Sequence, residues 1–305
     1  MDKEILAWGG FIAFVVCMLI LDLGLFQRKA HEIKVRESLL LTAFWVGLAL
    51  LFNLGIYWIQ GPHKAFEFLT GYLIEESLSV DNIFVFLLIF NYFSVPPAAQ
   101  RTALFWGILG AIVLRAVFII TGLTLIAKFH WLLYFFGGLL IWTGIKMVSD
   151  KDKEIHPERN PVLKIFRKFV PTTAHYEGNK FFVKRDSKYF ATPLFVVLLV
   201  IETTDLVFAV DSIPAIFSIT LDPFIVYTSN IFAILGLRAL YFTLAGVMKQ
   251  FHYLSYGLAA ILVFVGVKML ISDMYHIPIV IALSMVAGIL ILSIATSMIY
   301  PKHGK

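Results

Sequence analysis

The sequence contains a single cysteine, Cys17, and little charge, since only 15% of its 305 residues are Asp, Glu, Lys or Arg. One cysteine excludes an intrachain disulfide and a thiolate metal cluster. Soluble domains carry about 25% charged residues, so the low charge excludes a water-soluble enzyme. Hydrophobic residues make up 60% of the chain. They form long blocks without heptads, which excludes disorder and coiled coils.

Nine of these apolar blocks are long enough to cross a membrane, because about 20 residues span the hydrocarbon. Lipid offers the backbone no hydrogen bonds, so helices are expected. The sequence therefore predicts an all-α membrane protein with about nine transmembrane helices, near residues 5–26, 38–60, 66–92, 102–127, 129–148, 191–219, 224–248, 251–271 and 276–299.

The basic residues predict the orientation of these helices. With nine spans, eighteen Lys and Arg fall on one side of the membrane and three on the other, and ten of the eighteen lie in segment 149–190. Basic residues favour the cytoplasmic side. We therefore expect a periplasmic N-terminus and a cytoplasmic C-terminus.

The chain repeats itself at a spacing of 122–124 residues. Leu114-Arg115-Ala116 recurs as Leu237-Arg238-Ala239, and Gly144-Ile145-Lys146-Met147 recurs as Gly266-Val267-Lys268-Met269. Each copy holds three spans. Because three is odd, the second copy enters the membrane in the opposite sense, which predicts a 3+3 inverted-topology repeat of the kind that secondary transporters use.

The repeat divides the chain into five expected parts. Two peripheral helices (1–60) come before the first three-helix repeat (61–148). A cytoplasmic polar loop (149–190) follows, with a basic amphipathic helix at 162–170 against the inner leaflet and a hairpin at 181–190. The second repeat (191–272) leads to a final helix and a cytoplasmic tail (273–305).

Seven acidic residues are assigned to the predicted spans, although each charge costs roughly 2.5–3.5 kcal/mol at mid-helix. They must therefore face the protein interior and be paired, protonated or bound to a cation. Six of them lie in the first helix of a repeat, and the seventh, Asp22, reads as structural or interfacial. The seven are Asp22, Glu75, Glu76, Asp81, Glu202, Asp205 and Asp211.

The six repeat acids predict an ion site where the two acidic helices meet near the bilayer midplane. Glu202 and Asp205 share one helix face, as do Glu75 and Asn82. Pro214 follows Asp211 closely, so we expect a broken helix around 211–215. Oxygen ligands favour a hard divalent cation such as Mn²⁺, Mg²⁺ or Ca²⁺ over zinc or copper.

Two other interpretations of the acids remain open. One is a proton relay, and the other is a structural network with the arginines near the centres of two spans, Arg115 and Arg238. The chain shows no Ser/His/Asp order, phosphate loop or redox cysteine pair, so we expect neither an enzyme nor a prosthetic group. The basic residues follow the topology rule, so nucleic acid is not an expected partner.

Two long motifs resemble those of the TerC family of integral membrane proteins, especially its Alx-type bacterial members. They are Gly71-Tyr72-Leu73-Ile74-Glu75-Glu76-Ser77-Leu78-Ser79-Val80-Asp81-Asn82 and Glu202-Thr203-Thr204-Asp205-Leu206-Val207-Phe208-Ala209-Val210-Asp211-Ser212-Ile213-Pro214-Ala215. The resemblance runs through nearly the whole chain. It implies membership of the LysE-type exporter superfamily and Mn²⁺ export at the bacterial inner membrane. The family's polar motif positions correspond to Glu75, Asp81, Asn82, Glu202, Asp205 and Asp211, whereas Glu76 falls outside them.

The expected function is therefore a secondary transporter that exports Mn²⁺ from the cytoplasm, coupled to proton entry. A non-transporting membrane protein for assembly or for tellurium and metal stress is the alternative, as is a channel or an exporter of another cation such as Ca²⁺. The oligomeric state is not predicted.

Overall fold

The computed structural model describes residues 2–21, 35–129, 131–149, 162–163, 165–166, 170–185, 188–247, 253–275 and 277–299. The chain separates into two compact units, Met1–Lys34 and Val35–Lys305. The first unit contains helix α1 (Asp2–Leu21), on which Cys17 is exposed. The expected acid Asp22 lies outside the described residues.

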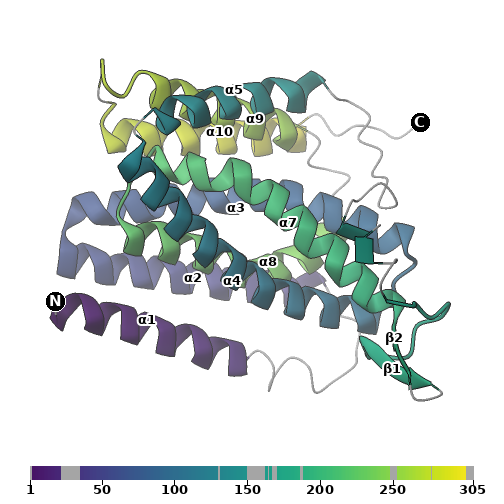
Figure 1. The fold of residues 1–305 in the computed structure, drawn as a ribbon. Coiled ribbons are helices and arrows are strands. Elements are labelled where there is room, and N and C mark those ends of the chain that lie inside the picture. The colour runs from purple at the N-terminus through teal and green to yellow at the C-terminus, as the bar shows by residue number, and fades with distance from the viewer. Residues whose placement is uncertain are drawn as a thin grey trace. The chain divides into compact units, whose positions relative to one another are not determined.

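In its described residues the second unit consists of helices and a small hairpin (Figure 1). Each of the nine apolar blocks predicted from the sequence contains a helix. The long helices described in this unit are α2 (Val35–Gln60), α3 (Pro62–Tyr92), α4 (Pro97–Lys128), α5 (Leu132–Ser149), α7 (Pro193–Phe217), α8 (Pro223–Val247), α9 (Leu254–Leu270) and α10 (Ile279–Ile299).

Six of the helices in the described part of the chain, α2, α4, α5, α7, α8 and α10, are long and apolar enough to cross a membrane. The outer helices also expose large apolar side chains, including Ile59 on α2, Trp142 on α5 and Leu292 on α10. Such surfaces are stable in lipid and costly in water. The chain is therefore a multi-pass integral membrane protein.

The helices pack in pairs that cross the expected repeat. In the second unit α3 packs against α8, α4 against α7, and α5 along α9, with α10 beside α9 (Figure 1). The first helix of each predicted repeat thus contacts the second helix of the other, and the two third helices contact each other.

Glycines allow α5 and α9 to approach closely. A Cβ placed on Gly137 would lie 3.0 Å from the Gly266 carbonyl oxygen, and one on Gly144 would lie 2.7 Å from the Ala259 carbonyl oxygen. Small residues permit such backbone contact between membrane helices. Because the partner number falls as the α5 number rises, the two helices run antiparallel.

The prediction of broken helices is wrong, because α3 and α7 are both continuous. Pro214 lies inside α7, which extends to Phe217. A proline removes one backbone hydrogen bond. Here it does so in the last turn, where the following Ser218 and Thr220 amides donate to the Pro214 and Ile216 carbonyl oxygens. The helix therefore ends soon after the proline instead of breaking at it.

The 149–190 loop contains the expected hairpin. Strands β1 (Phe182–Arg185) and β2 (Lys188–Ala191) pair antiparallel, with Arg185 opposite Lys188. Of the predicted amphipathic helix only 162–163 and 165–166 are described, as helix. There Leu163 is buried in the protein core, among residues of α3, α4, α7 and α8, whereas Val162 and Ile165 are exposed. The Tyr176 hydroxyl donates to the Phe93 carbonyl oxygen over 2.8 Å, which ties the loop to the end of α3.

A buried arginine–carboxylate cluster

Arg115 of α4 joins side chains from three other helices. Its Nη1 donates to Glu75 Oε1 on α3, to Asn230 Oδ1 on α8 at 2.5 Å and to Ser212 Oγ on α7 at 3.2 Å. Its Nη2 donates to Asp205 Oδ1 on α7, also at 3.2 Å. Arg115 is only 1% exposed, Glu75 0% and Asp205 4%, so this cluster is shielded from solvent on all sides.

The cluster lies near the middle of its helices, between two apolar layers. On α7, Val200 and Ile201 precede Asp205 and belong to one buried hydrophobic cluster, whereas Ala209 and Ile213 follow it and belong to another. Charges held between apolar layers interact more strongly than they would in water. The charged groups are therefore separated by apolar layers from both ends of α7.

Among the side chains that the structure describes, several polar atoms in the cluster have no hydrogen-bond partner. They include Glu75 Oε2, Asp205 Oδ2, Arg115 Nε and Asn230 Nδ2, all of them buried. Buried polar atoms are normally satisfied, and arginine commonly binds carboxylates through two parallel bonds. Here each carboxylate gives the guanidinium one oxygen, so the second oxygen of both acids remains open to another donor or cation.

Glu202 lies one helical turn before Asp205 and faces α4. Its carboxylate fills the space beside Gly110, where a Cβ would overlap Glu202 Oε1. Glu202 Oε2 is buried and has no hydrogen-bond partner among the described residues. Glu76 takes a different direction, since its carboxylate lies near Gly236 of α8 and Gly236 itself lies near Trp45 of α2.

A cavity of about 450 Å³ opens beside the cluster, between α3, α5, α7 and α9. Asn82, Asp211 and Ser212 are among its lining residues, and Thr143 Oγ1 donates to Asp211 Oδ1 at 3.1 Å. Ser212 also contacts Arg115. The cavity therefore reaches the buried cluster through one shared residue.

The residues predicted from the sequence are thus divided between two places. The structure brings Glu75 and Asp205 together on Arg115, and places Asn82 and Asp211 on the cavity. The Asp81 side chain lies outside the described part, and Arg238 is half-buried on α8. Among the side chains that the structure describes, no three His, Cys, Asp or Glu gather closely enough to hold a metal ion.

Three polar residues in the interior were missed by the sequence interpretation. Ser212 and Asn230 contact Arg115, but single small polar residues in apolar helices carry no distinctive pattern. Glu67 is an additional buried acid within the predicted span 66–92, only 6% exposed. Its signal is local, because His63 and Lys64 precede it by four and three residues and lie on the same helix face.

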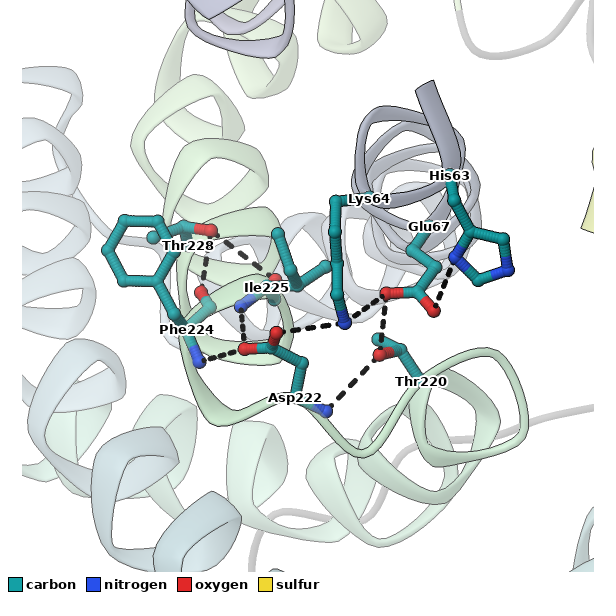
Figure 2. Close-up of polar contacts among 8 residues, drawn as sticks. All are labelled: His63, Lys64, Glu67, Thr220, Asp222, Phe224, Ile225 and Thr228. Atoms are coloured by element: carbon teal, nitrogen blue, oxygen red, sulfur yellow. Dashed lines mark hydrogen bonds and ion pairs between the residues drawn. The ribbon is translucent and has the colours of Figure 1, made fainter. Parts of the chain in front are cut away.

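Glu67 belongs to a second polar cluster, which joins the start of α3 to the α7–α8 turn (Figure 2). Its carboxylate accepts hydrogen bonds from Lys64 at 2.9 Å and from Thr220 at 2.8 Å. Lys64 also pairs with Asp222 at 2.9 Å. Asp222 Oδ1 in turn accepts a hydrogen bond of 3.0 Å from the Phe224 amide and so caps the N-terminus of α8. Burial lowers the Lys64 pKa, but the two carboxylates outweigh it and raise the pKa above its ordinary value.

The sequence has clear relatives. The profile described as "Integral membrane protein TerC family" matches residues 60–305. An "Uncharacterized membrane protein STKORF319" from Myxococcus xanthus is 52% identical, with 97% of this chain and 93% of that protein covered. The "Putative membrane-bound redox modulator Alx" of Salmonella typhi is 51% identical, over 95% and 92% of the two chains. Its namesake in Escherichia coli K12 is 49% identical, over 98% and 97%. No solved structure matches. The chain belongs to the TerC family of integral membrane proteins.

Proposed function

We propose that this protein is a secondary transporter that exports a divalent cation, Mn²⁺ foremost, across the bacterial inner membrane. The observation that carries the proposal is the meeting of Glu75 and Asp205 at mid-helix. Both are buried, and each has one oxygen without a partner among the described residues. Two acids from different helices, with open oxygens in a shielded place, are suited to hold a cation that must lose its water.

The α5–α9 contacts support the inverted repeat that such transporters use. The repeat spacing of 122 residues relates Gly137 to Ala259 and Gly144 to Gly266. Exchanging the two copies therefore converts the Gly137–Gly266 contact into the Ala259–Gly144 contact, and both are present. Because α5 and α9 are antiparallel, this exchange is the one that a two-fold axis in the membrane plane would produce, as in inverted-topology transporters.

The ligand chemistry favours a hard ion. The candidate ligands Glu75, Asn82, Glu202, Asp205 and Asp211, together with Asp81, offer carboxylate and amide oxygens and no nitrogen or sulfur. Oxygen ligands suit Mn²⁺, Mg²⁺ and Ca²⁺. The resemblance described above adds the preference for Mn²⁺. The ion is substrate, and we propose no resident cofactor and no enzymatic activity.

The cavity supplies a place for the ion to enter. Asp211, Asn82 and Thr143 give it oxygen donors, and Ser212 links it to Glu75 and Asp205 through Arg115. We propose that a partly hydrated ion is received in the cavity and is then passed to the inner carboxylates. Protons moving in the opposite direction are the proposed coupling ions.

The rival function is a membrane protein that does not transport. One observation favours it: Arg115 already balances one charge of the Glu75 and Asp205 pair, as a structural tie would. The names of the Alx relatives add redox modulation. Thiol redox chemistry in this chain would rest on Cys17 alone, so a redox role is better explained as a consequence of the ions that the protein moves.

Ion flux separates these functions. The purified full chain would be reconstituted into liposomes, and entry of Mn²⁺, Ca²⁺, Mg²⁺ and Zn²⁺ would be compared with entry into liposomes without protein. We expect Mn²⁺ to move fastest and Zn²⁺ least. If no ion crossed faster than in protein-free liposomes, the transporter proposal would be wrong and the non-transporting function would stand.

A further inference from the structure

Arg115 holds a position that the transported cation would also need. Its guanidinium carries one positive charge and contacts Glu75 and Asp205 at the same time. A divalent ion bound to both carboxylates would sit roughly 2.0–2.6 Å from their oxygens. The open oxygens, Glu75 Oε2 and Asp205 Oδ2, belong to the same two carboxylates that Arg115 contacts. A divalent ion bound there would repel the guanidinium at close range and disfavour its contacts.

The hydrogen bonds around Arg115 leave some donors and acceptors unsatisfied, which is not expected of a purely structural ion pair. Within the described part of the chain, Arg115 Nε and Asn230 Nδ2 are buried donors without acceptors, whereas Glu75 Oε2 and Asp205 Oδ2 are buried acceptors without donors. Each unsatisfied buried group costs free energy. Donors and acceptors thus coexist unpaired in one cluster, which leaves these side chains free to form a second set of contacts.

Glu202 offers Arg115 a third carboxylate besides Glu75 and Asp205. It stands three residues before Asp205, on the same face of α7, and its Oε2 is buried and unpartnered. A shift of the guanidinium by one turn along α7 would exchange Asp205 for Glu202. Arg115 would then remain paired while Glu75 and Asp205 became free for the ion.

We propose that Arg115 is a built-in competitor of the transported cation, displaced when the ion binds Glu75 and Asp205 and returning when the ion leaves. This inference rests on the proposed function, since it takes that pair as an ion site. It gives the charge balance of the cycle: the two carboxylates are neutral with one divalent ion, and with Arg115 alone they keep one negative charge, which attracts the next ion.

The residues that hold Arg115 in place distinguish a competitor from a ligand, because the two roles predict opposite changes in ion affinity when those residues are removed. Asn230 and Ser212 accept hydrogen bonds from its guanidinium. If they hold the competitor in place, their removal loosens Arg115 and tightens ion binding. If Asn230 or Ser212 were itself an ion ligand, removing that residue would weaken ion binding. If Arg115 were a fixed structural residue, removing either of them would leave ion binding unchanged.

The first experiment measures Mn²⁺ binding to the full chain in detergent by calorimetry. We expect Asn230→Ala to bind Mn²⁺ about tenfold more tightly, the order given by one hydrogen bond to a charged group, and Ser212→Ala to shift affinity in the same direction. Asn53→Ala on α2, a partly buried asparagine away from the Arg115 contacts, is the matched control and should leave affinity within about twofold.

The second experiment replaces the competitor by a free ion. In Arg115→Ala, millimolar guanidinium should enter the vacated place and weaken Mn²⁺ binding, whereas sodium at the same concentration should not. Wild-type protein should respond equally to both salts. Because the readout is the difference between two salts on one variant, a general loss of stability does not produce it.

Each outcome has one meaning. Tighter binding in Asn230→Ala, with guanidinium competition in Arg115→Ala, supports the competitor. Unchanged or weaker binding in Asn230→Ala, while wild type binds Mn²⁺ normally, overturns the competitor and leaves the transporter proposal intact. Absence of Mn²⁺ binding in wild type overturns the transporter proposal itself, and the inference falls with it.

Discussion

Glu202 of α7 occupies the space beside Gly110 of α4, which a side chain on Gly110 would take from it. The contact joins α7 to α4, which pack against each other, and α4 carries Arg115 five residues after Gly110. It also explains why glycine stands at this point of an otherwise apolar helix. The Glu202 carboxylate lies where it does because position 110 has no Cβ.

Gly110→Ala should therefore impair Mn²⁺ export without preventing membrane insertion. The added methyl group must displace the Glu202 carboxylate, and overpacking of this kind costs about 1–3 kcal/mol. Survival of cells in Mn²⁺ and the Tm of the protein in detergent should both be lower than for wild type. Gly138→Ala on α5 is the control, since nothing lies within 4 Å of its added Cβ. Equal Mn²⁺ survival and equal Tm of the two variants would show that Glu202 is not part of the ion site.

The helices follow from the sequence because their signal is local. A block such as 102–127 is apolar over its full length, and lipid leaves helix as its only stable backbone. The acids on α3 and α7 are equally visible, since charges are rare in such blocks. Their convergence is predicted as well, from the repeat and the span count.

What the sequence does not reveal is which groups pair. Arg115 and Arg238 look equivalent in the repeat, yet only the packing of four helices shows that Arg115 lies between Glu75 and Asp205. Pro214 is a second example. It predicts a break in isolation, but its effect depends on where the helix ends, and α7 ends one turn later.

The cluster in Figure 2 should stabilise the protein through Lys64. Lys64→Glu would place a third acid beside Glu67 and Asp222, and we expect a lower Tm in detergent. Adding Asp222→Lys should recover part of the loss. Full additivity of the two losses would show that Lys64 and Asp222 do not interact across this turn.

The same cluster predicts a pH dependence. The pKa of Lys64 is raised in the folded protein. The stability that Lys64 contributes is therefore fully present below the ordinary lysine pKa of 10.5 and is lost as the pH rises through the pKa of the folded state. The Tm difference between wild type and Lys64→Met should thus stay constant from neutral pH to about 10 and shrink above it. A difference that grew with pH would contradict this sign.

The topology is tested by fusions at two turns. A reporter placed after Ser149 should read as cytoplasmic, and one placed in the Thr220 to Pro223 turn as external. The prediction follows from the basic residues of segment 149–190 and from the odd number of spans in each repeat. Both reporters on one side of the membrane would contradict the inverted arrangement.

Export should be coupled to proton entry. With the interior negative, moving a divalent ion outward costs about 2 × 2.3 kcal/mol per 100 mV, equivalent to a gradient of more than a thousandfold. The carboxylates can carry the driving protons, because they still outnumber the charge of Arg115 when the metal leaves and therefore favour proton uptake. A pH-sensitive dye inside proteoliposomes should report proton movement opposite to Mn²⁺. Mn²⁺ flux without it, at any imposed potential, would rule the coupling out.

The central claim is that the buried acids carry the ion, and Mn²⁺ flux through amide variants in proteoliposomes tests it most directly. Glu75→Gln and Asp205→Asn should lower flux by about a hundredfold or more, the scale of losing an essential charged ligand in a shielded site. Asp81→Asn, Glu202→Gln and Asp211→Asn should also impair it, and Glu76→Gln should be milder. Glu177→Gln, in the loop and paired with Arg185, should transport like wild type. Wild-type flux in both Glu75→Gln and Asp205→Asn, with the proteins folded and reconstituted, would contradict the account.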